Sequence, residues 1–292
     1  MALYRPSELK EFLASLGIAP KKALSQNFLI DGNIIRKIAK TAAISSNDVV
    51  LEIGPGPGSL TEELLAQGAE VIAIEKDTLL GNALARLQTG DQRLHIFLQD
   101  ALEVPYESLL QPFIDKGRRV QVVANLPYNI TTPILTKLLP LHHLFSNIIV
   151  MVQEEVAQRI CAKPDSADMS SLTLFCQYYA DVRYGFFVKK NSFFPAPSVD
   201  SAVVVFSLKS NLLEPKEEEF LFSLTRTAYQ HRRKMLRGSL LPFASAEAIM
   251  EGLTKLGLSP LARPQELSLE DFIAFSRDLG DNEDHLRFRS HP

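Results

Sequence analysis

Short apolar runs alternate with segments of helical periodicity through the first 210 residues, and this alternation constrains the fold more than any other feature. The runs are "DVVLEIG", "EVIAIEKD", "LHIFLQDA", "RVQVVAN", "NIIVMVQ" and "DSAVVVFSL", and several are separated by helical segments such as "SLTEELLAQG". Strands that are buried on both faces by crossover helices have this appearance. The pattern predicts an α/β domain with a parallel sheet covered by helices.

The last strand of this sheet is expected to run against its neighbours. The segment "FFVKKNSFFPAPSVDSAV" leads into the final apolar run, and it is too short to contain a crossover helix. We therefore expect an antiparallel addition at the sheet edge. The result is a Rossmann-like α/β fold with a mixed, mostly parallel sheet of about seven strands.

The pattern changes near Lys216, after which helical segments follow one another without strands between them. These segments are "EEEFLFSLTRTAYQHRRKMLRGSLL", "SAEAIMEGLTKLGL" and "SLEDFIAFSRDL". We expect two domains, an α/β catalytic domain over residues 1–210 and a small all-helical domain over residues 211–292. Residues 210–215 would form the linker.

Composition excludes several classes of protein. Hydrophobic residues make up 46% of the 292 residues, enough for a substantial core. The N-terminus has no signal pattern, and no apolar run reaches the roughly 20 residues that a membrane span needs. Cys161 and Cys176 are too few for a disulfide framework and are expected to be reduced core thiols. We expect a cytoplasmic protein without a membrane partner, and the net charge of −3 confines any RNA contact to a local surface.

A glycine-rich loop follows the first predicted strand. In "LEIGPGPGS" the residues Gly54, Gly56 and Gly58 stand between a strand and a helical segment, where the backbone can approach a ligand closely. Ser59 and Glu62 have the spacing of a capping box, which predicts a helix beginning just after the glycines. The alternative is that the loop is only a tight turn.

Acidic residues at three strand ends indicate the charge of the ligand. Glu52 precedes the glycines, Glu75 ends the second run, and Asp100 follows the third. An acid about 20 residues after a glycine loop binds ribose hydroxyls in nucleotide-binding α/β folds. NAD fits the loop and Glu75, but it would bring a diphosphate to three carboxylates. S-adenosylmethionine, a cationic nucleoside without phosphates, fits better, although Asp100 could also be only a helix cap.

The segment "NLPY" follows the fourth run and suits methylation of an amine on a nucleobase. The lone pair of such an amine is delocalised into the ring, so the enzyme must localise it. The Asn125 side-chain oxygen and the Leu126 carbonyl would accept the amine hydrogens and direct the lone pair at the methyl group. Pro127 would fix the chain there, and Tyr128 would stack on an extruded base. The alternative is a proline turn with a satisfied Asn and a core Tyr.

Seven motifs together resemble the ribosomal RNA adenine dimethyltransferases and occur in the order of that family: "KKALSQNFLID", "LEIGPGPGSLT", "IEKD", "QDA", "NLPYNITTPIL", "FFPAPSVDSAVV" and "HRRKMLRGSL". The similarity spans nearly the whole chain. It is closest to the bacterial small-subunit (16S) branch, which dimethylates two adjacent adenosines near the 3′ end, and more distant from the erythromycin-resistance methyltransferases. The resemblance implies an S-adenosylmethionine-dependent enzyme that acts as a monomer, without a metal, on 16S rRNA within an immature small ribosomal subunit.

The same resemblance assigns roles to individual residues. The implied cofactor contacts are Asn27, Leu29, Gly54, Glu75, Asp100 and Asn125. Among these, Glu75 would bind the ribose and Asp100 the adenine amine. Phe193 would stack on the target base opposite Tyr128, for which the alternative is a hydrophobic plug before a proline turn.

The most basic stretch of the chain opens the helical domain. Its members are Arg226, His231, Arg232, Arg233, Lys234 and Arg237. Clustered arginines suit phosphate and A-form backbone recognition, so we expect rRNA to bind here, whereas the alternative is a solvated helix face. Two rival functions remain open for the chain, a Rossmann oxidoreductase and a non-catalytic assembly or transcription factor. The intact Asn-Leu-Pro-Tyr segment speaks against the second.

Overall fold

The structure of the protein, a computed structural model, describes residues 3–21, 24, 26–88, 90, 92–210 and 213–281. The chain divides into two compact units. Unit 1 comprises Met1–Ala157 and Ala180–Leu208, and unit 2 comprises Gln158–Tyr179 and Lys209–Pro292. Residues 211–212 of the expected linker and residues 282–292 of the expected helical domain lie outside the described residues.

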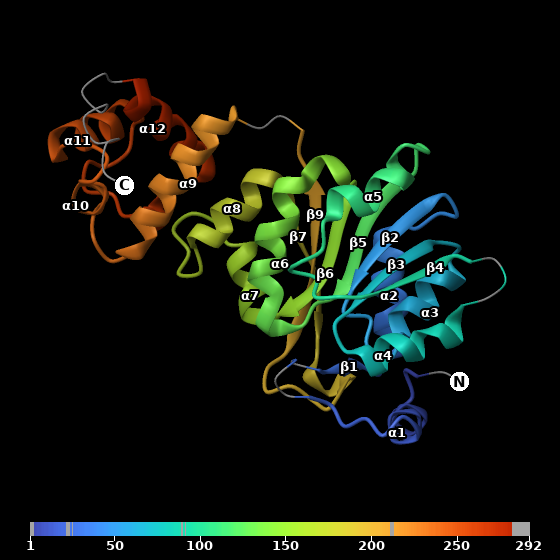
Figure 1. Ribbon diagram of the computed structural model, residues 1–292. Helices are drawn as coiled ribbons and strands as arrows, with labels where there is room; N and C mark the ends of the chain where they lie inside the picture. Colours follow the sequence, from blue (N-terminus) through green and yellow to red (C-terminus); the bar gives the residue numbers. More distant parts are fainter. Residues whose placement is uncertain are drawn as a thin grey trace. The chain divides into compact units, whose positions relative to one another are not determined.

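Unit 1 is built on a seven-stranded sheet (Figure 1). Its strands are β2 (Asp48–Ile53), β3 (Glu70–Glu75), β4 (Leu94–Leu98), β5 (Arg119–Asn125), β6 (Asn147–Gln153), β7 (Ala180–Val188) and β9 (Ser201–Leu208). They lie in the order β4-β3-β2-β5-β6-β9-β7. Pairing is parallel from β4 to β6, whereas β9 is antiparallel to both of its neighbours. The predicted mixed, mostly parallel sheet is confirmed.

The edge of the sheet differs from the prediction. The final apolar run is antiparallel, but as β9 it lies inside the sheet, and the edge strand is β7. No apolar run marked β7, because Asp181, Arg183 and Tyr184 are exposed and interrupt its pattern. Gly185 stands at a shift of register, where an added Cβ would lie 2.9 Å from the Val203 carbonyl oxygen. Charged side chains and an irregular register are common on edge strands, because they hinder pairing with a second sheet.

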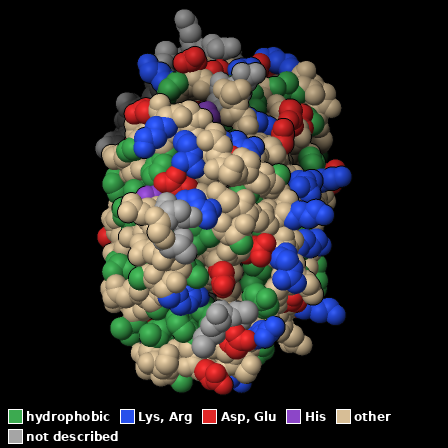
Figure 2. All heavy atoms as spheres, turned by 90° about the vertical axis from the view of Figure 1, so that its right-hand side faces the viewer, with side chains coloured by type: hydrophobic (Ala, Val, Ile, Leu, Met, Phe, Trp, Pro, Cys, Tyr) green, Lys and Arg blue, Asp and Glu red, His purple; other side chains and the backbone are tan. Residues whose placement is uncertain are grey.

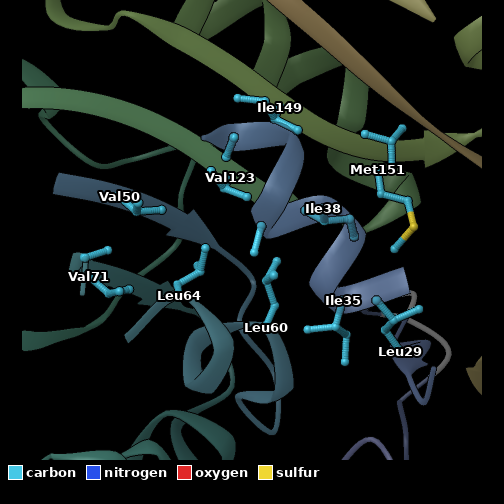
Figure 3. Close-up of a cluster of buried hydrophobic side chains, with 14 of the residues drawn as sticks. Leu29, Ile35, Ile38, Val50, Leu60, Leu64, Val71, Val123, Ile149 and Met151 are labelled. Carbon is cyan, nitrogen blue, oxygen red and sulfur yellow. The ribbon is translucent and has the colours of Figure 1, made fainter. Parts of the chain in front are cut away.

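Helices cover both faces of the sheet. On one face α2 (Gly32–Ala42) and α3 (Ser59–Ala66) pack apolar stripes, including Ile38 and Leu64, against strand residues such as Val50 and Val123 (Figure 3). On the other face lie α5 (Tyr106–Ile114) and α6 (Thr131–Leu138) (Figure 1). The remaining elements are α1 (Pro6–Ser15), α4 (Thr78–Ala83), η2 (Leu84–Leu87), η3 (Tyr128–Ile130), η4 (Leu139–Leu144), η5 (Lys190–Ser192), and a small sheet of β1 (Phe28–Leu29) and β8 (Phe193–Phe194).

Unit 2 is helical and includes a segment that we expected in the α/β domain. Its elements are α8 (Ser171–Tyr179), α9 (Pro215–Gln230), α10 (Leu236–Ser239), α11 (Ala246–Lys255), η6 (Pro264–Glu266) and α12 (Leu269–Asp281), and the unit boundary falls within α7 (Glu154–Ile160). The rings of Phe175, Tyr178 and Tyr179 on α8 pack around Phe222 of α9. Both tyrosine hydroxyls donate to Glu218. These contacts group residues 158–179 with the helical unit.

The described residues contain no helix long and apolar enough to cross a membrane. They also contain no group of three or more His, Cys, Asp or Glu side chains arranged to hold a metal ion. Neither Cys161 nor Cys176 is in a disulfide, and Cys176 is buried. Figure 2 shows acidic and basic side chains interspersed over one face, with lysine and arginine side chains gathered along one of its edges.

Candidate active site

The topology of unit 1 creates a crevice between β2 and β5. The chain passes from β2 outward to β3 and β4, then returns to β5 and continues to β6 on the other side. Such a switch point is where α/β proteins bind ligands, at the carboxyl ends of the strands. A pocket lies there, and its lining includes all the predicted cofactor residues and the Asn-Leu-Pro-Tyr segment, namely Asn27, Leu29, Gly54, Glu75, Asp100, Asn125, Leu126, Pro127 and Tyr128.

Strand alternation explains why polar side chains reach this pocket. Val50 and Val123 belong to the apolar cluster beneath α2 and α3 (Figure 3). Glu52 and Asn125 follow them by two residues on the same strands, so they face the same side of the sheet. The face that carries the core therefore ends, at the carboxyl edge, in the polar groups of the pocket.

The glycine loop has a left-handed backbone that favours glycine. Gly54, Gly56 and Gly58 have φ angles of +67°, +56° and +88°. A Cβ on Gly54 would lie 3.2 Å from the Pro127 ring, so this glycine lets the loop after β2 touch the turn after β5. The capping-box prediction is wrong: α3 begins at Ser59 with Gly58 as its N-cap, and no side chain caps it.

Glu75 connects the loop to the second strand end. Its carboxylate accepts bonds from the Gly56 N–H at 3.0 Å and from the Asp77 N–H at 2.8 Å. Burial raises the pKa of Glu75. Asp77 in turn accepts from Lys21 at 2.8 Å and from Gln26 at 3.1 Å, which ties the N-terminal segment to the same side of the pocket. Glu75 therefore shapes the loop as well as lining the site.

Asp100 forms an ion pair with Lys76 in the pocket lining. Lys76 donates to its carboxylate at 2.6 Å, and this bond holds the pKa of Asp100 below its ordinary value. The Lys76 side chain is 61% exposed, and exposed ion pairs of this kind contribute little to stability. A ligand amine can therefore replace the lysine as the partner of Asp100 at small cost.

Two buried groups test whether a cationic cofactor fits. Glu52 accepts a 2.6 Å bond from the Thr61 hydroxyl, and burial raises the pKa of Glu52 to about 8. The Ser59 hydroxyl lines the same pocket, is buried, and has no hydrogen-bond partner among the described residues. The ammonium and carboxylate of S-adenosylmethionine would supply a charge for the first group and a partner for the second. The residues present fit this cofactor.

The turn after β5 forms the other wall of the pocket. The Asn125 amide nitrogen donates to the Asn27 carbonyl at 3.3 Å, which leaves its side-chain oxygen as an acceptor. The Leu126 N–H donates to a backbone carbonyl of β6 at 3.2 Å and anchors the turn. The Tyr128 and Ser201 hydroxyls are 2.7 Å apart, and burial raises the pKa of Tyr128. The phenol is therefore neutral, and its ring is held in place at the pocket.

Phe193 is not among the residues that line the pocket with Tyr128. The Phe193 side chain is 3% exposed and packs in the core cluster of unit 1, outside the pocket lining. This packing resembles the hydrophobic plug that is the alternative interpretation of its motif, and the predicted stacking of Phe193 on a target base stays a prediction.

The basic cluster of unit 2 occupies the end of α9 and the turn into α10. The side chains of Arg233 and Lys234 are exposed, and no described residue forms an ion pair with either. Arg232 donates to two backbone carbonyls of the loop before α8. Arg226 donates to a carbonyl of α9, and Arg237 approaches a methionine sulfur. The single long helix expected over this stretch ends at Gln230, so the cluster is carried partly by a turn.

Two contacts and one unpartnered group of the site were not predicted from the sequence. They are the bond from Lys76 to Asp100, the bond between Tyr128 and Ser201, and the unpartnered hydroxyl of Ser59. The first two join residues 24 and 73 positions apart in the chain, and local pattern carries no signal for such pairs. The hydroxyl of Ser59 was interpreted as a cap because its spacing to Glu62 allowed it.

An acidic pocket at the switch point suits a cationic nucleoside, and the turn beside it suits an amine on a planar ring. Together they define the class as S-adenosylmethionine-dependent methyltransferases with a Rossmann-like fold. The chain belongs to the ribosomal RNA adenine dimethylase family, whose family model matches residues 18–277. It is thus an rRNA adenine dimethyltransferase that uses S-adenosylmethionine.

Individual relatives agree with this assignment. The chain is 49% identical over 288 residues to the ribosomal RNA small subunit methyltransferase A of Protochlamydia amoebophila (strain UWE25), covering 98% of this chain and 100% of the relative. A dimethyladenosine transferase from Plasmodium falciparum has a similar structure, with a TM-score of 0.71 and 26% identity over 85% of this chain and 95% of that chain. The 23S rRNA methyltransferase ErmE shares the fold, with a TM-score of 0.68 and 24% identity over 87% and 100%.

The raised pKa of Glu52 predicts a pH dependence of stability. Between its ordinary pKa of 4.5 and about 8, the folded protein keeps a proton that the unfolded chain has lost. The free energy of unfolding should therefore fall as pH rises through this window, by at most about 1.4 kcal/mol per pH unit from this group. Glu52→Gln should remove that slope, as measured by urea unfolding at several pH values. Identical slopes in wild type and variant would show that Glu52 is ionised throughout.

If the Tyr128 ring stacks on the target base, its hydroxyl bond to Ser201 should matter less for the methylation rate than the ring itself. Tyr128→Ala should lose the stacking surface, worth about 1–3 kcal/mol per base. Tyr128→Phe keeps the ring and loses only the hydroxyl bond, worth about 0.5–1.5 kcal/mol, so it should retain much of the methylation rate. Ser201→Ala should have the same small effect, and the double variant should be no worse than either single one. Additive losses in single-turnover assays would mean that the two hydroxyls act separately.

Proposed function

We propose that the protein converts two adjacent adenosines near the 3′ end of 16S rRNA to N6,N6-dimethyladenosine within an immature small ribosomal subunit. Family membership supports the reaction, and the name of the 49% identical relative supports the small subunit as substrate. The observation that carries the proposal is the turn after β5, where Asn125 lines the acidic pocket and its amide nitrogen, not its oxygen, is used in the bond to Asn27.

The turn can orient an exocyclic amine for methyl transfer. Asn125 is held through its amide nitrogen by the Asn27 carbonyl, so its oxygen can accept one amine hydrogen. The Leu126 carbonyl, anchored by the bond of its own residue to β6, would accept the other. With both hydrogens directed to acceptors, the nitrogen lone pair points toward the methyl group that the cofactor supplies. Alignment of this kind can contribute about 7–11 kcal/mol to lowering a barrier.

Proton transfer needs no dedicated base at this site. Asn125 cannot take up a proton, but the methylated nitrogen is cationic at first and releases a proton readily to water. When that proton leaves, the monomethylated nitrogen keeps one hydrogen for one of the two acceptors, and its lone pair can be directed at a methyl group for the second transfer. The carboxylates Glu52, Glu75 and Asp100 line the cofactor side of the pocket, where they would hold the cofactor and take no part in this step.

Unit 1 would be the catalytic domain and unit 2 the main rRNA-recognition domain. The exposed side chains of Arg226, Arg233, Lys234 and Arg237, with Arg232 beside them, support contact with the phosphates of a folded RNA. We propose that the protein acts as a cytoplasmic monomer, because the substrate is assembled there and the pocket is complete within one chain. Phe193 would join the target base only if the segment that carries it moved out of the core.

Asn125→Ala should abolish methyl transfer while leaving binding intact. Loss of one group that acts on the reacting atoms costs about 100-fold to 1,000-fold in rate, whereas the RNA contacts of unit 2 are untouched. Small subunits lacking the methyl groups are the substrate, and nucleoside mass spectrometry of their rRNA is the readout. Asn147→Ala, at the amino end of β6, is the matched control. Full dimethylation by the Asn125 variant would refute the mechanism, and an inactive wild type would refute the function.

The basic turn of unit 2 gives a second prediction. Arg233→Glu should weaken binding to the small subunit and flatten its salt dependence, because each lost phosphate contact removes a released counterion. Lys216→Glu has the same charge change at the other end of α9, about 24 Å away along a helix of 16 residues, and should bind nearly as the wild type does. Filter binding at several salt concentrations separates the two. Equal losses would indicate a general charge effect and a solvated turn.

A further inference from the structure

Unit 1 carries a second group of cations, on the acceptor side of the pocket. Lys10, Lys37, Lys189 and Lys190 are exposed, and none of the carboxylates in the described residues forms an ion pair with them. On the cofactor side, by contrast, Lys21 and Lys76 are each paired, with Asp77 and Asp100. Unpaired cations that gather in one place, in a chain with a net charge of −3, indicate a surface that meets an anion.

Two of these lysines lie against aromatic rings. The Lys37 Nζ is 4.0 Å from the centre of the Phe186 ring, and the Lys10 Nζ is 5.0 Å from the centre of the Phe194 ring. Phe186 and Phe194 stand at the two ends of the segment that contains the other two lysines. All four cations therefore surround residues 186–194, and we call this group the basic rim. The aromatic contacts limit the freedom of two of the lysines.

The basic rim borders the acceptor side of the pocket. Val188 pairs with Ser201, the residue whose hydroxyl holds Tyr128, so the chain leaves the sheet at Lys189 close to that tyrosine. At the other end of the segment, Phe194 pairs with Phe28, which lines the pocket. Strand pairing thus connects one end of the segment to Ser201, which bonds to Tyr128, and the other end to Phe28 in the pocket lining.

The acidic groups nearby are occupied by other bonds. Asp200 accepts from the Lys190 N–H at 2.8 Å. Asp31 caps α2 and accepts from the Ser192 hydroxyl at 3.3 Å. Glu154 accepts from the Tyr184 hydroxyl at 2.8 Å. These carboxylates organise the backbone around the rim and leave the lysine ammonium groups to solvent.

We propose that the basic rim binds the phosphates of the single-stranded RNA that flanks the target adenosine. This inference rests on the proposed function and adds a second RNA contact to that of unit 2. A base can reach the pocket only when its nucleotide is extruded from its neighbours, and cations beside the pocket would hold the flanking backbone while that happens. The Phe187 side chain, 45% exposed within the same segment, offers a ring face to a neighbouring base.

The test reverses two charges of the rim and compares them with two matched charges elsewhere. Lys189→Glu with Lys190→Glu removes the two lysines that make no aromatic contact. Lys116→Glu with Lys216→Glu gives the same change of charge with exposed lysines outside the rim, one just before β5 and one in the first turn of α9. Both pairs are assayed for S-adenosylhomocysteine affinity by calorimetry and for binding to unmethylated small subunits at several salt concentrations.

The rim variant should bind the small subunit at least about tenfold more weakly, and the slope of log affinity on log salt should shrink by about 1.4, or 0.7 for each of two contacts to single-stranded RNA. The control should change by less than about twofold, because its lysines belong to neither proposed RNA contact and salt screens the long-range effect of exposed charges. Affinity for S-adenosylhomocysteine should not change in either. Equal losses in the two pairs would overturn the proposal.

A neutral variant keeps the test independent of any disturbance by the new carboxylates. Lys189→Gln with Lys190→Gln should reproduce the weaker binding and the reduced salt slope. Wild-type affinity and slope in this variant would overturn the proposal whatever the charge-reversed protein does. Failure of the proposed function is distinguishable, because the wild type itself would then form no dimethyladenosine in the same subunits.

Discussion

The close approach of the glycine loop to the Asn-Leu-Pro-Tyr turn is the contact on which the rest of the site depends. A Cβ on Gly54 would stand 3.2 Å from the Pro127 ring, and φ at Gly54 is +67°, so glycine favours both the loop conformation and its close contact with the turn. One loop belongs to the cofactor side and the other to the acceptor side. Glu75 holds the first through the Gly56 N–H, and β6 holds the second through the Leu126 N–H. The distance between the two reactants is thus set by backbone contacts.

The same pocket gathers polar groups that the protein itself does not fully satisfy. Burial keeps Glu52 protonated near neutral pH, Asp100 is covered by an exposed lysine, and the Ser59 hydroxyl lacks a partner. Each of these groups is costly in an apolar protein and becomes favourable beside a cationic ligand. A site of this kind selects against phosphates, which is why a dinucleotide is a poor fit despite the Rossmann-like topology.

The protein as a whole has a net charge of −3, so its overall charge does not favour RNA binding. We propose that cations act from local surfaces, one in the turn after α9 and one around residues 186–194. The first is built on a helical unit whose aromatic core draws in α8 from the middle of the chain. The second is built on the antiparallel end of the sheet and reaches the catalytic turn through Val188 and Ser201. Their separate elements suit separate tasks, docking of a folded RNA and control of one strand near the target.

The sequence alone determined the sheet, the glycine loop and the residues of the pocket. Continuous apolar runs indicate strands that are buried on both faces. Polar residues at the carboxyl ends of parallel strands lie at the same edge of the sheet. Other features depend on the tertiary structure, because the local sequence pattern contains no signal for them. The sequence did not predict β7, because exposed charged residues interrupt its apolar pattern. Residues 158–179 belong to unit 2, because their aromatic side chains pack against a helix that is distant in the sequence. Ser59 is the first residue of α3 and has no hydrogen-bond partner for its hydroxyl among the described residues, because Gly58 is the N-cap. The burial of Phe193 and the bond of Ser201 to Tyr128 depend on contacts between segments that are distant in the sequence. Only the tertiary structure brings these segments together.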